Sequence, residues 1–130
     1  MKPELKIKRK QKLGIKPFYD TCMYSLSGIF NYLFHEASAK RFLFSFVVET
    51  ILVLTLKAKY AEILAFYIIL AAILAVELIN TAIEAAVDLC TLEIHPLAKI
   101  AKDCGSAATF VLTLVSVVIC LFVFVPYFIG

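Results

Sequence analysis

Long apolar runs separated by short charged segments dominate most of the chain, and their lengths predict membrane-crossing helices. Three such runs lie at about residues 42–56, 61–89 and 106–129. A helix rises ~1.5 Å per residue, so a run of ~20 residues crosses the ~30 Å hydrocarbon core of a bilayer. The first run is slightly short and needs its flanking residues to span. We therefore predict an all-α integral membrane protein with three transmembrane helices.

Residues 18–35 follow a different pattern, in which large apolar side chains recur at roughly helical spacing among polar ones. This segment is too polar to span a membrane, so we expect an amphipathic helix lying at the membrane surface. Residues 1–17 contain seven of the chain's lysines and arginines. We expect this basic arm to lie near an anionic membrane face, followed by a single membrane domain at 18–130.

The lysines and arginines are distributed unevenly around the predicted helices, and this predicts an orientation. Eleven of the 13 precede the first apolar run or lie between the second and third, whereas only Lys57 and Lys59 lie between the first and second. Cytoplasmic segments are rich in such residues. We therefore expect the N-terminus and the 91–103 loop to be cytoplasmic and the C-terminus to lie outside.

The composition supports a membrane protein and excludes several soluble classes. Apolar residues make up 62% of 130 residues, against about 45–50% in soluble domains, and so short a chain cannot bury that excess by itself. The four cysteines are widely separated and match no zinc or redox spacing, so we interpret them as packing residues. No Walker sequence is present, which excludes a soluble P-loop fold. We expect no nucleic-acid partner.

The second apolar run carries a stripe of polar residues. Glu77, Asn80, Glu84 and Asp88 are offset by 3, 7 and 11 positions, which places them on one helix face. A charged residue near the membrane centre costs about 2.5–3.5 kcal/mol on insertion scales. The stripe indicates either a functional site or a helix end leaving the membrane. The second reading explains Asp88 well, Glu84 in part and Glu77 poorly.

The segment after this stripe mixes acids, bases and a histidine between residues 93 and 106. Carboxylate oxygens suit Mg²⁺, and lysines suit phosphate oxygens. If the chain is a membrane enzyme that uses a nucleotide, it binds the nucleotide with these helix-borne carboxylates and the basic loop. A small channel or transporter, with the carboxylates lining its pathway, is the second hypothesis. A scaffolding subunit without chemistry is the third.

Three motifs carry a resemblance to a known family: Glu-Leu-Ile-Asn-Thr-Ala-Ile-Glu-Ala-Ala-Val-Asp at 77–88, His-Pro-Leu-Ala-Lys at 95–99 and Ala-Lys-Asp-Cys-Gly-Ser-Ala-Ala at 101–108. They resemble the signature of the prokaryotic diacylglycerol kinase and undecaprenol kinase family, over roughly residues 16–129. The resemblance implies an ATP- and Mg²⁺-dependent lipid kinase. It also implies a homotrimer with shared active sites in the bacterial inner membrane.

The resemblance also implies roles for individual residues. Glu77 resembles the general base that takes the proton from the lipid hydroxyl, and Asn80 the neighbour that positions it. Glu84 and Glu36 resemble the carboxylates that bind the metal near the ATP phosphates. The implied nucleotide contacts are Tyr24, Glu93, His95, Lys102 and Asp103, with Lys102 and Asp103 forming a clamp, and Ser106 resembles a lipid contact.

The sequence departs from the family near its N-terminus and again at Lys40, which matches the family's basic residue only loosely, and it leaves the lipid substrate open. The family has an arginine about seven residues before the Tyr24 position, where this chain has Pro17 beside Lys16. Lysine supplies charge without the bidentate fork of arginine. Glu36-Ala37-Ser38 and Gly105-Ser106-Ala107-Ala108 favour diacylglycerol as the substrate. His95-Pro96-Leu97-Ala98-Lys99 favours undecaprenol, which is the alternative.

Glu49 has no counterpart in these motifs and lies near the middle of the first apolar run. A lipid-facing charge at that depth would be costly. Glu49 either forms a hydrogen bond within the helical bundle or borders the lipid cleft and influences substrate choice. We predict the first, a packing role.

Overall fold

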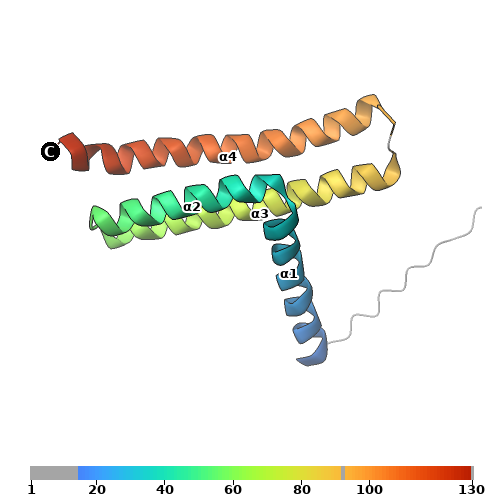
Figure 1. Ribbon diagram of the computed structural model, residues 1–130, viewed down its shortest axis with the longest axis horizontal. Helices are drawn as coiled ribbons and strands as arrows, with labels where there is room; N and C mark the ends of the chain where they lie inside the picture. Colours follow the sequence, from blue (N-terminus) through green and yellow to red (C-terminus); the bar gives the residue numbers. More distant parts are fainter. Residues whose placement is uncertain (1–14, 92, 130) are drawn as a thin grey trace, which may run out of the picture.

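The computed structural model of this chain describes residues 15–91 and 93–129, which form four helices and no strand. The helices are α1 (Ile15–His35), α2 (Ala37–Thr55), α3 (Tyr60–Cys90) and α4 (Pro96–Ile129). Figure 1 shows their arrangement. The basic arm predicted at 1–17 lies outside the described residues except for its last three.

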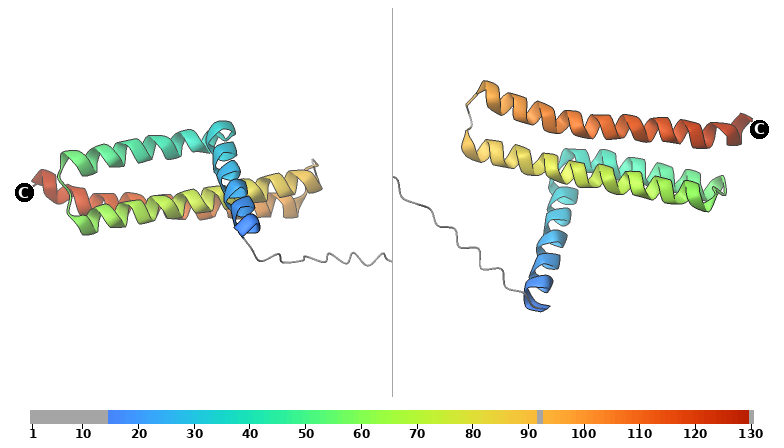
Figure 2. Two further views of the ribbon diagram at one scale, coloured as in Figure 1. Left: turned by 90° about the horizontal axis from the view of Figure 1, so that it is seen from below. Right: turned by 180° about the vertical axis from the view of Figure 1, so that it is seen from behind.

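Helices α2, α3 and α4 run alongside one another, and α1 projects away from them. α2, α3 and α4 form an elongated bundle, and α1 leaves it at a steep angle from the start of α2 (Figure 1). α1 packs against both α2 and α3. The hairpin of α3 and α4 extends well beyond the level at which α1 meets the bundle, as the other two views confirm (Figure 2).

The turn between α2 and α3 is formed by a residue in the left-handed conformation. Lys57 has a φ of 51°, and the N–H of Ala58 donates to the carbonyl oxygen of Val53 at 3.2 Å. This bond satisfies a carbonyl that the end of α2 would otherwise leave unpaired. α3 then begins at once, with the Glu62 carboxylate accepting the backbone N–H of Lys59 at 2.7 Å.

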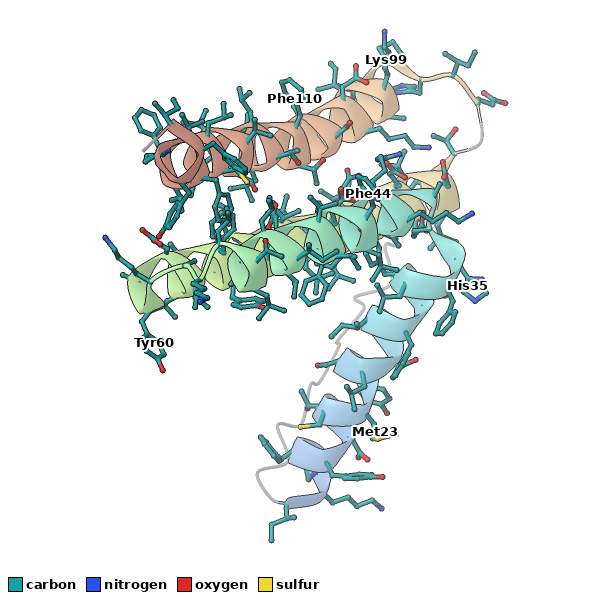
Figure 3. The ribbon with its side chains drawn as sticks, turned by 60° about the vertical axis from the view of Figure 1, so that its left-hand side comes forward. Met23, His35, Phe44, Tyr60, Lys99 and Phe110 are labelled. Atoms are coloured by element: carbon teal, nitrogen blue, oxygen red, sulfur yellow. The ribbon has the colours of Figure 1, made fainter. Side chains whose placement is uncertain are left out.

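A small apolar core joins the bundle at the end remote from α1. Val53, Phe66 and Phe124 are buried together, and the rings of Phe66 and Phe124 stack with centroids 4.9 Å apart. Most other large apolar side chains are exposed. Phe110, on the outer side of α4 (Figure 3), is 67% exposed. Such a surface requires lipid or other copies of the chain to cover it.

α3 and α4 are each long and apolar enough to cross a membrane. The 19 residues of α2 include the charged residues Lys40, Arg41 and Glu49. These charges make α2 less apolar than α3 and α4, and so a less clear membrane-spanning helix. The two long apolar helices support membrane character, whereas the number of spans, the surface position of α1 and the trimer remain predictions.

The helices are longer than the apolar runs from which they were predicted. α1 begins at Ile15 rather than residue 18, and α2 begins at Ala37 rather than residue 42. The largest difference is in α4, which starts at Pro96, ten residues before the predicted 106. The apolar runs mark the lipid-facing part of a helix, and polar residues such as Lys99 and Lys102 continue the same helix outside it. The predicted loop 91–103 is therefore much shorter, at 91–95.

The Glu49 carboxylate points into the bundle. Its side chain is 8% exposed, and its Oε1 accepts a hydrogen bond from the Ser116 hydroxyl of α4 at 3.4 Å. Its Oε2 is buried without a partner among the described residues. The hydrogen bond within the bundle thus agrees with the predicted packing role, while the effect of Glu49 on substrate choice stays a prediction.

Candidate functional site

The polar stripe of α3 faces the other helices. Glu77, Asn80 and Glu84 are each half-buried, whereas Asp88 is exposed near the end of the helix. The Asn80 Nδ2 donates to Glu84 Oε1 at 3.1 Å, one turn along the helix. This hydrogen bond fixes the orientation of the Glu84 carboxylate. The Asn80 Oδ1 is buried and has no partner among the described residues.

Asn80 lies against a glycine of α4. A Cβ built on Gly105 would lie 2.1 Å from Asn80 Oδ1 and 3.2 Å from its Cγ, closer than side-chain atoms can approach. Gly105 is itself buried. The absence of a side chain at Gly105 therefore lets α4 pack directly on the carboxamide of Asn80.

The elbow between α1 and α2 brings two more polar side chains to the bundle. Glu36 is the N-cap of α2 and makes no side-chain capping bond, so its half-buried carboxylate is available to a ligand. Tyr32, one turn earlier, is 1% exposed. The Ser38 hydroxyl donates to the Tyr32 hydroxyl at 3.4 Å, which ties the end of α1 to the start of α2.

A groove of about 320 Å³ lies where α3 ends and α4 begins. The polar residues that line it are Asp88, Thr91, Glu93, His95, Lys99, Lys102 and Asp103. Four of the predicted nucleotide contacts, Glu93, His95, Lys102 and Asp103, are thus gathered in one groove. Its lining combines lysines, which suit phosphate, with carboxylates, which suit a divalent cation.

An ion pair crosses the groove. Lys102 Nζ lies 2.6 Å from Asp88 Oδ1, and both side chains are substantially exposed, at 39% and 52%. A pair this exposed stabilises a fold by about 0–1 kcal/mol at most. Lys102 can therefore exchange Asp88 for a phosphate at little cost. Its partner here is Asp88, while the neighbouring Asp103 of the predicted clamp is exposed.

The turn that carries the groove is held by local hydrogen bonds. The Thr91 hydroxyl oxygen accepts the backbone N–H of Glu93 at 3.1 Å. His95 Nδ1 accepts the N–H of Leu97 at 3.2 Å, so the imidazole caps α4, and Pro96 occupies the first helical position as it commonly does. This cap leaves Nε2 as the His95 nitrogen that can meet a ligand.

Three further predicted site residues are not among those that line this groove in the single chain. Tyr24 is 76% exposed on the stretch of α1 that projects from the bundle, next to Met23 (Figure 3). Lys16 is exposed at the start of the same helix. Ser106 follows Gly105 within α4 and is exposed. The fold therefore does not bring Tyr24 or Lys16 to the groove of their own chain.

The carboxylates fit Mg²⁺ only as part of a larger site. Within residues 15–91 and 93–129, no three His, Cys, Asp or Glu side chains gather as a metal site. Mg²⁺ in phosphoryl-transfer sites, however, is bound by one or two carboxylates together with substrate phosphates and water. The uncapped Glu36 and the oriented Glu84 supply oxygen donors of that kind.

The sequence did not single out Tyr32 or Gly105 as site residues. In the sequence, Tyr32 cannot be distinguished from the other aromatic residues of the predicted amphipathic helix. Gly105 was noted only as part of a motif. The signal for both residues lies in contacts between helices, because Gly105 meets Asn80 of α3 and Tyr32 meets Ser38 of α2.

The chain is similar to known proteins over most of its length. The family model for prokaryotic diacylglycerol kinase matches residues 23–124. A diacylglycerol kinase of Pseudomonas aeruginosa is 38% identical over 109 residues, covering 83% of this chain and 89% of that protein. An undecaprenol kinase of Bacillus subtilis is 37% identical over 97 residues, covering 74% and 72%. A diacylglycerol kinase of a Sinorhizobium species is 34% identical over 99 residues, covering 76% and 72%.

Proposed function

Since the chain belongs to the prokaryotic diacylglycerol kinase family and is a membrane lipid kinase, we propose that it phosphorylates diacylglycerol. The phosphoryl donor is ATP with Mg²⁺, and the product is phosphatidic acid. One observation carries this proposal. The half-buried stripe of Glu77, Asn80 and Glu84 leads along α3 to the groove that holds Lys102 and His95. A single helix thus connects a membrane-buried carboxylate with a polar, water-accessible groove.

The proposed reaction divides these residues between two substrates. The hydroxyl oxygen of the lipid attacks the γ-phosphorus of ATP, and Glu77 accepts the proton that this hydroxyl loses. The bond from the γ-phosphorus to the bridging oxygen breaks, and ADP leaves. Phosphoryl transfer relies on positioning and charge neutralisation more than on covalent catalysis. Asn80 orients Glu84 through its 3.1 Å hydrogen bond, and Lys102 neutralises phosphate charge.

Mg²⁺, when bound, neutralises charge on the transferred phosphate. Glu36 and Glu84 are the carboxylates of this chain that would hold it. The nucleotide would occupy the groove between α3 and α4, with Glu93, His95 and Asp103 contacting it. The remaining proposed contacts are Tyr24 with the nucleotide, and Ser106 and Lys16 with the lipid.

The arrangement of the helices supports a topology for this membrane protein. We place α2, α3 and α4 across the bilayer and α1 along its cytoplasmic surface, in the bacterial inner membrane. The α3–α4 hairpin extends beyond the level of α1 (Figure 1), so in this placement the groove enters the cytoplasm and the C-terminus lies outside. Because Tyr24 and Lys16 are remote from their own groove, they fit a homotrimer in which sites are shared between subunits.

Undecaprenol is the second candidate substrate. The similarity to an undecaprenol kinase, 37% identical, is nearly as high as the similarity to a diacylglycerol kinase, 38%. Both lipids offer a hydroxyl at the membrane surface, so one site could phosphorylate either. We favour diacylglycerol on the motifs around Glu36 and Gly105.

The test is phosphoryl transfer by purified protein in vesicles that contain either lipid, with ATP and Mg²⁺ outside. We expect phosphatidic acid to form at the higher rate. Faster formation of undecaprenyl phosphate would assign the alternative substrate. Transfer to neither lipid, from protein that is folded and membrane-inserted, would contradict the proposed function.

A further inference from the structure

Asp88 is the acid of the α3 stripe to which the proposed reaction gives no role. It lies in the last turn of α3, which ends at Cys90. A carboxylate at this position meets the negative end of the helix dipole, where a cation is favoured instead. Solvation explains why an acid is tolerated at an exposed helix end, but the direction of its side chain needs a separate explanation.

The Asp88 carboxylate is directed at one lysine across the hairpin. Its Oδ1 accepts a hydrogen bond from Lys102 Nζ at 2.6 Å, so the bond joins α3 to α4. Both residues line the groove at the end of the hairpin, to which Lys99 also belongs (Figure 3). Lys102 is the lysine that we assign to the nucleotide phosphates. Asp88 and phosphate are therefore alternative acceptors for the same ammonium group.

The charges of the groove favour release of a nucleotide as well as its binding. The lining has three carboxylates, on Asp88, Glu93 and Asp103, against two lysines, Lys99 and Lys102. A groove that only had to hold a polyanion tightly would have an excess of cations. The pair of Asp88 and Lys102 is also substantially exposed, at 52% and 39%, so Lys102 can change partners readily.

We propose that Asp88 is a positioning residue that competes with the nucleotide phosphates for Lys102 and thereby limits how tightly the groove holds ADP. This inference rests on the proposed function, in which Lys102 binds phosphate. When a phosphate takes the ammonium group, the Asp88 carboxylate turns to water at the exposed helix end. When ADP leaves, Asp88 takes Lys102 back. An exposed ion pair that must be broken weakens ADP binding by up to about fivefold.

The test measures the Kd of ADP with Mg²⁺ by equilibrium titration of the full-length protein in lipid nanodiscs, where both membrane faces are accessible. Asp88→Asn removes the charge, Asp88→Ser is an independent second variant without it, and Asp88→Glu keeps it. Glu62→Gln is the control. It makes the same change of carboxylate to carboxamide at the far end of the bundle, where Glu62 accepts the Tyr127 hydroxyl at 2.6 Å.

We expect Asp88→Asn and Asp88→Ser to lower the Kd of ADP by about three- to fivefold, because Lys102 loses its competing acceptor. Asp88→Glu and Glu62→Gln should stay within about twofold of wild type. In a Lys102→Met background, Asp88→Asn should change the Kd by less than about twofold, because the coupling requires both partners. Unfolding temperatures should stay close to wild type, since so exposed a pair adds little stability.

Three results in folded variants would overturn the role of Asp88. The first is a Kd of ADP that is unchanged or raised in both Asp88→Asn and Asp88→Ser, which would leave a purely structural ion pair. The second is equally tight binding in Asp88→Glu, since the charge would then not be the cause. The third is an equal gain in the Lys102→Met background, since Asp88 would then repel phosphate directly rather than act through Lys102.

Failure of this inference is distinct from failure of the proposed function. A wild-type protein that phosphorylates lipid, and whose affinity for ADP does not depend on Asp88, contradicts only the role of Asp88. A folded wild-type protein that binds no ADP and transfers phosphate to neither lipid contradicts the proposed function, and the role of Asp88 with it.

Discussion

At the scale of single residues, the close contact between Asn80 and Gly105 holds the polar stripe in place. Gly105→Ala would put a Cβ 2.1 Å from Asn80 Oδ1, so the carboxamide must move and its bond to Glu84 must change. Overpacking of this kind costs typically about 1–3 kcal/mol. We expect a lower unfolding temperature and a markedly lower rate of lipid phosphorylation.

Gly28 offers the matched control for this change. It lies within α1, and nothing stands within 4 Å of an added Cβ. Alanine is favoured over glycine in a helix by about 1 kcal/mol, so Gly28→Ala should keep both stability and rate. If Gly105→Ala behaved in the same way, Asn80 would not depend on that close contact.

Glu49 is the residue for which packing and function make different predictions. Its hydrogen bond with Ser116 joins α2 to α4, and such bonds within membrane bundles contribute about 0.6 kcal/mol on average. Glutamine keeps an oxygen that can accept the Ser116 hydroxyl, so Glu49→Gln should keep the ratio of rates on diacylglycerol and undecaprenol. A shift of that ratio by more than about tenfold, ~1.4 kcal/mol, would place Glu49 at the lipid cleft.

At the scale of elements, the proposed metal ligands come from two different helices, Glu36 from the start of α2 and Glu84 from α3. We expect Glu36→Gln and Glu84→Gln each to raise the Mg²⁺ concentration needed for half-maximal rate sharply, because an amide is a poorer ligand for a hard cation. Glu93→Gln, in the groove but outside the proposed metal set, is the comparison. Wild-type Mg²⁺ titration curves for both variants would refute the shared metal.

The sequence predicted which segments are helical better than it predicted where they begin. Apolar runs locate the part of a helix that meets lipid, and they ended near the observed ends of α2 and α3. They missed the first ten residues of α4, because Lys99, Lys102 and Asp103 resemble a polar loop in sequence but continue the helix from Pro96. Solvation and helix formation are separate properties, and hydropathy reports only the first.

The polar stripe of α3 could be predicted because all of its members lie on one helix, where spacing alone determines the face. The groove could be predicted in part, since Glu93, His95, Lys102 and Asp103 are close in sequence. The positions of Tyr32 and Gly105 could not, because each depends on how one helix packs against another. Contacts between distant segments are the part of the site that requires the fold.

At the scale of the whole molecule, the separation of Tyr24 from its own groove makes the proposed homotrimer testable. Tyr24→Ala and Lys102→Met should each lower the rate on their own. If sites are shared between neighbouring subunits, randomly mixed trimers of the two variants contain intact sites at about a quarter of the total. We therefore expect the mixed sample to exceed the mean rate of the separate variants.

The control for this experiment is a mixture of Tyr24→Ala with itself, prepared by the same dissociation and reassembly. A mixed sample whose rate equals the mean of its two components would mean that each site is built within one chain. In that case α1 would have to swing toward its own groove, which its steep angle to the bundle opposes (Figure 2).

The most direct measurement is the rate of ATP-dependent phosphatidic acid formation by Glu77→Gln beside wild type, in vesicles of the same composition. Glutamine keeps the shape of the side chain and removes the base, and general-base catalysis contributes about 10²–10⁴-fold. We predict an assembled protein, with an unchanged unfolding temperature, whose phosphoryl transfer is lost. A folded Glu77→Gln that retains more than about a tenth of the wild-type rate would contradict a kinase site built on this carboxylate.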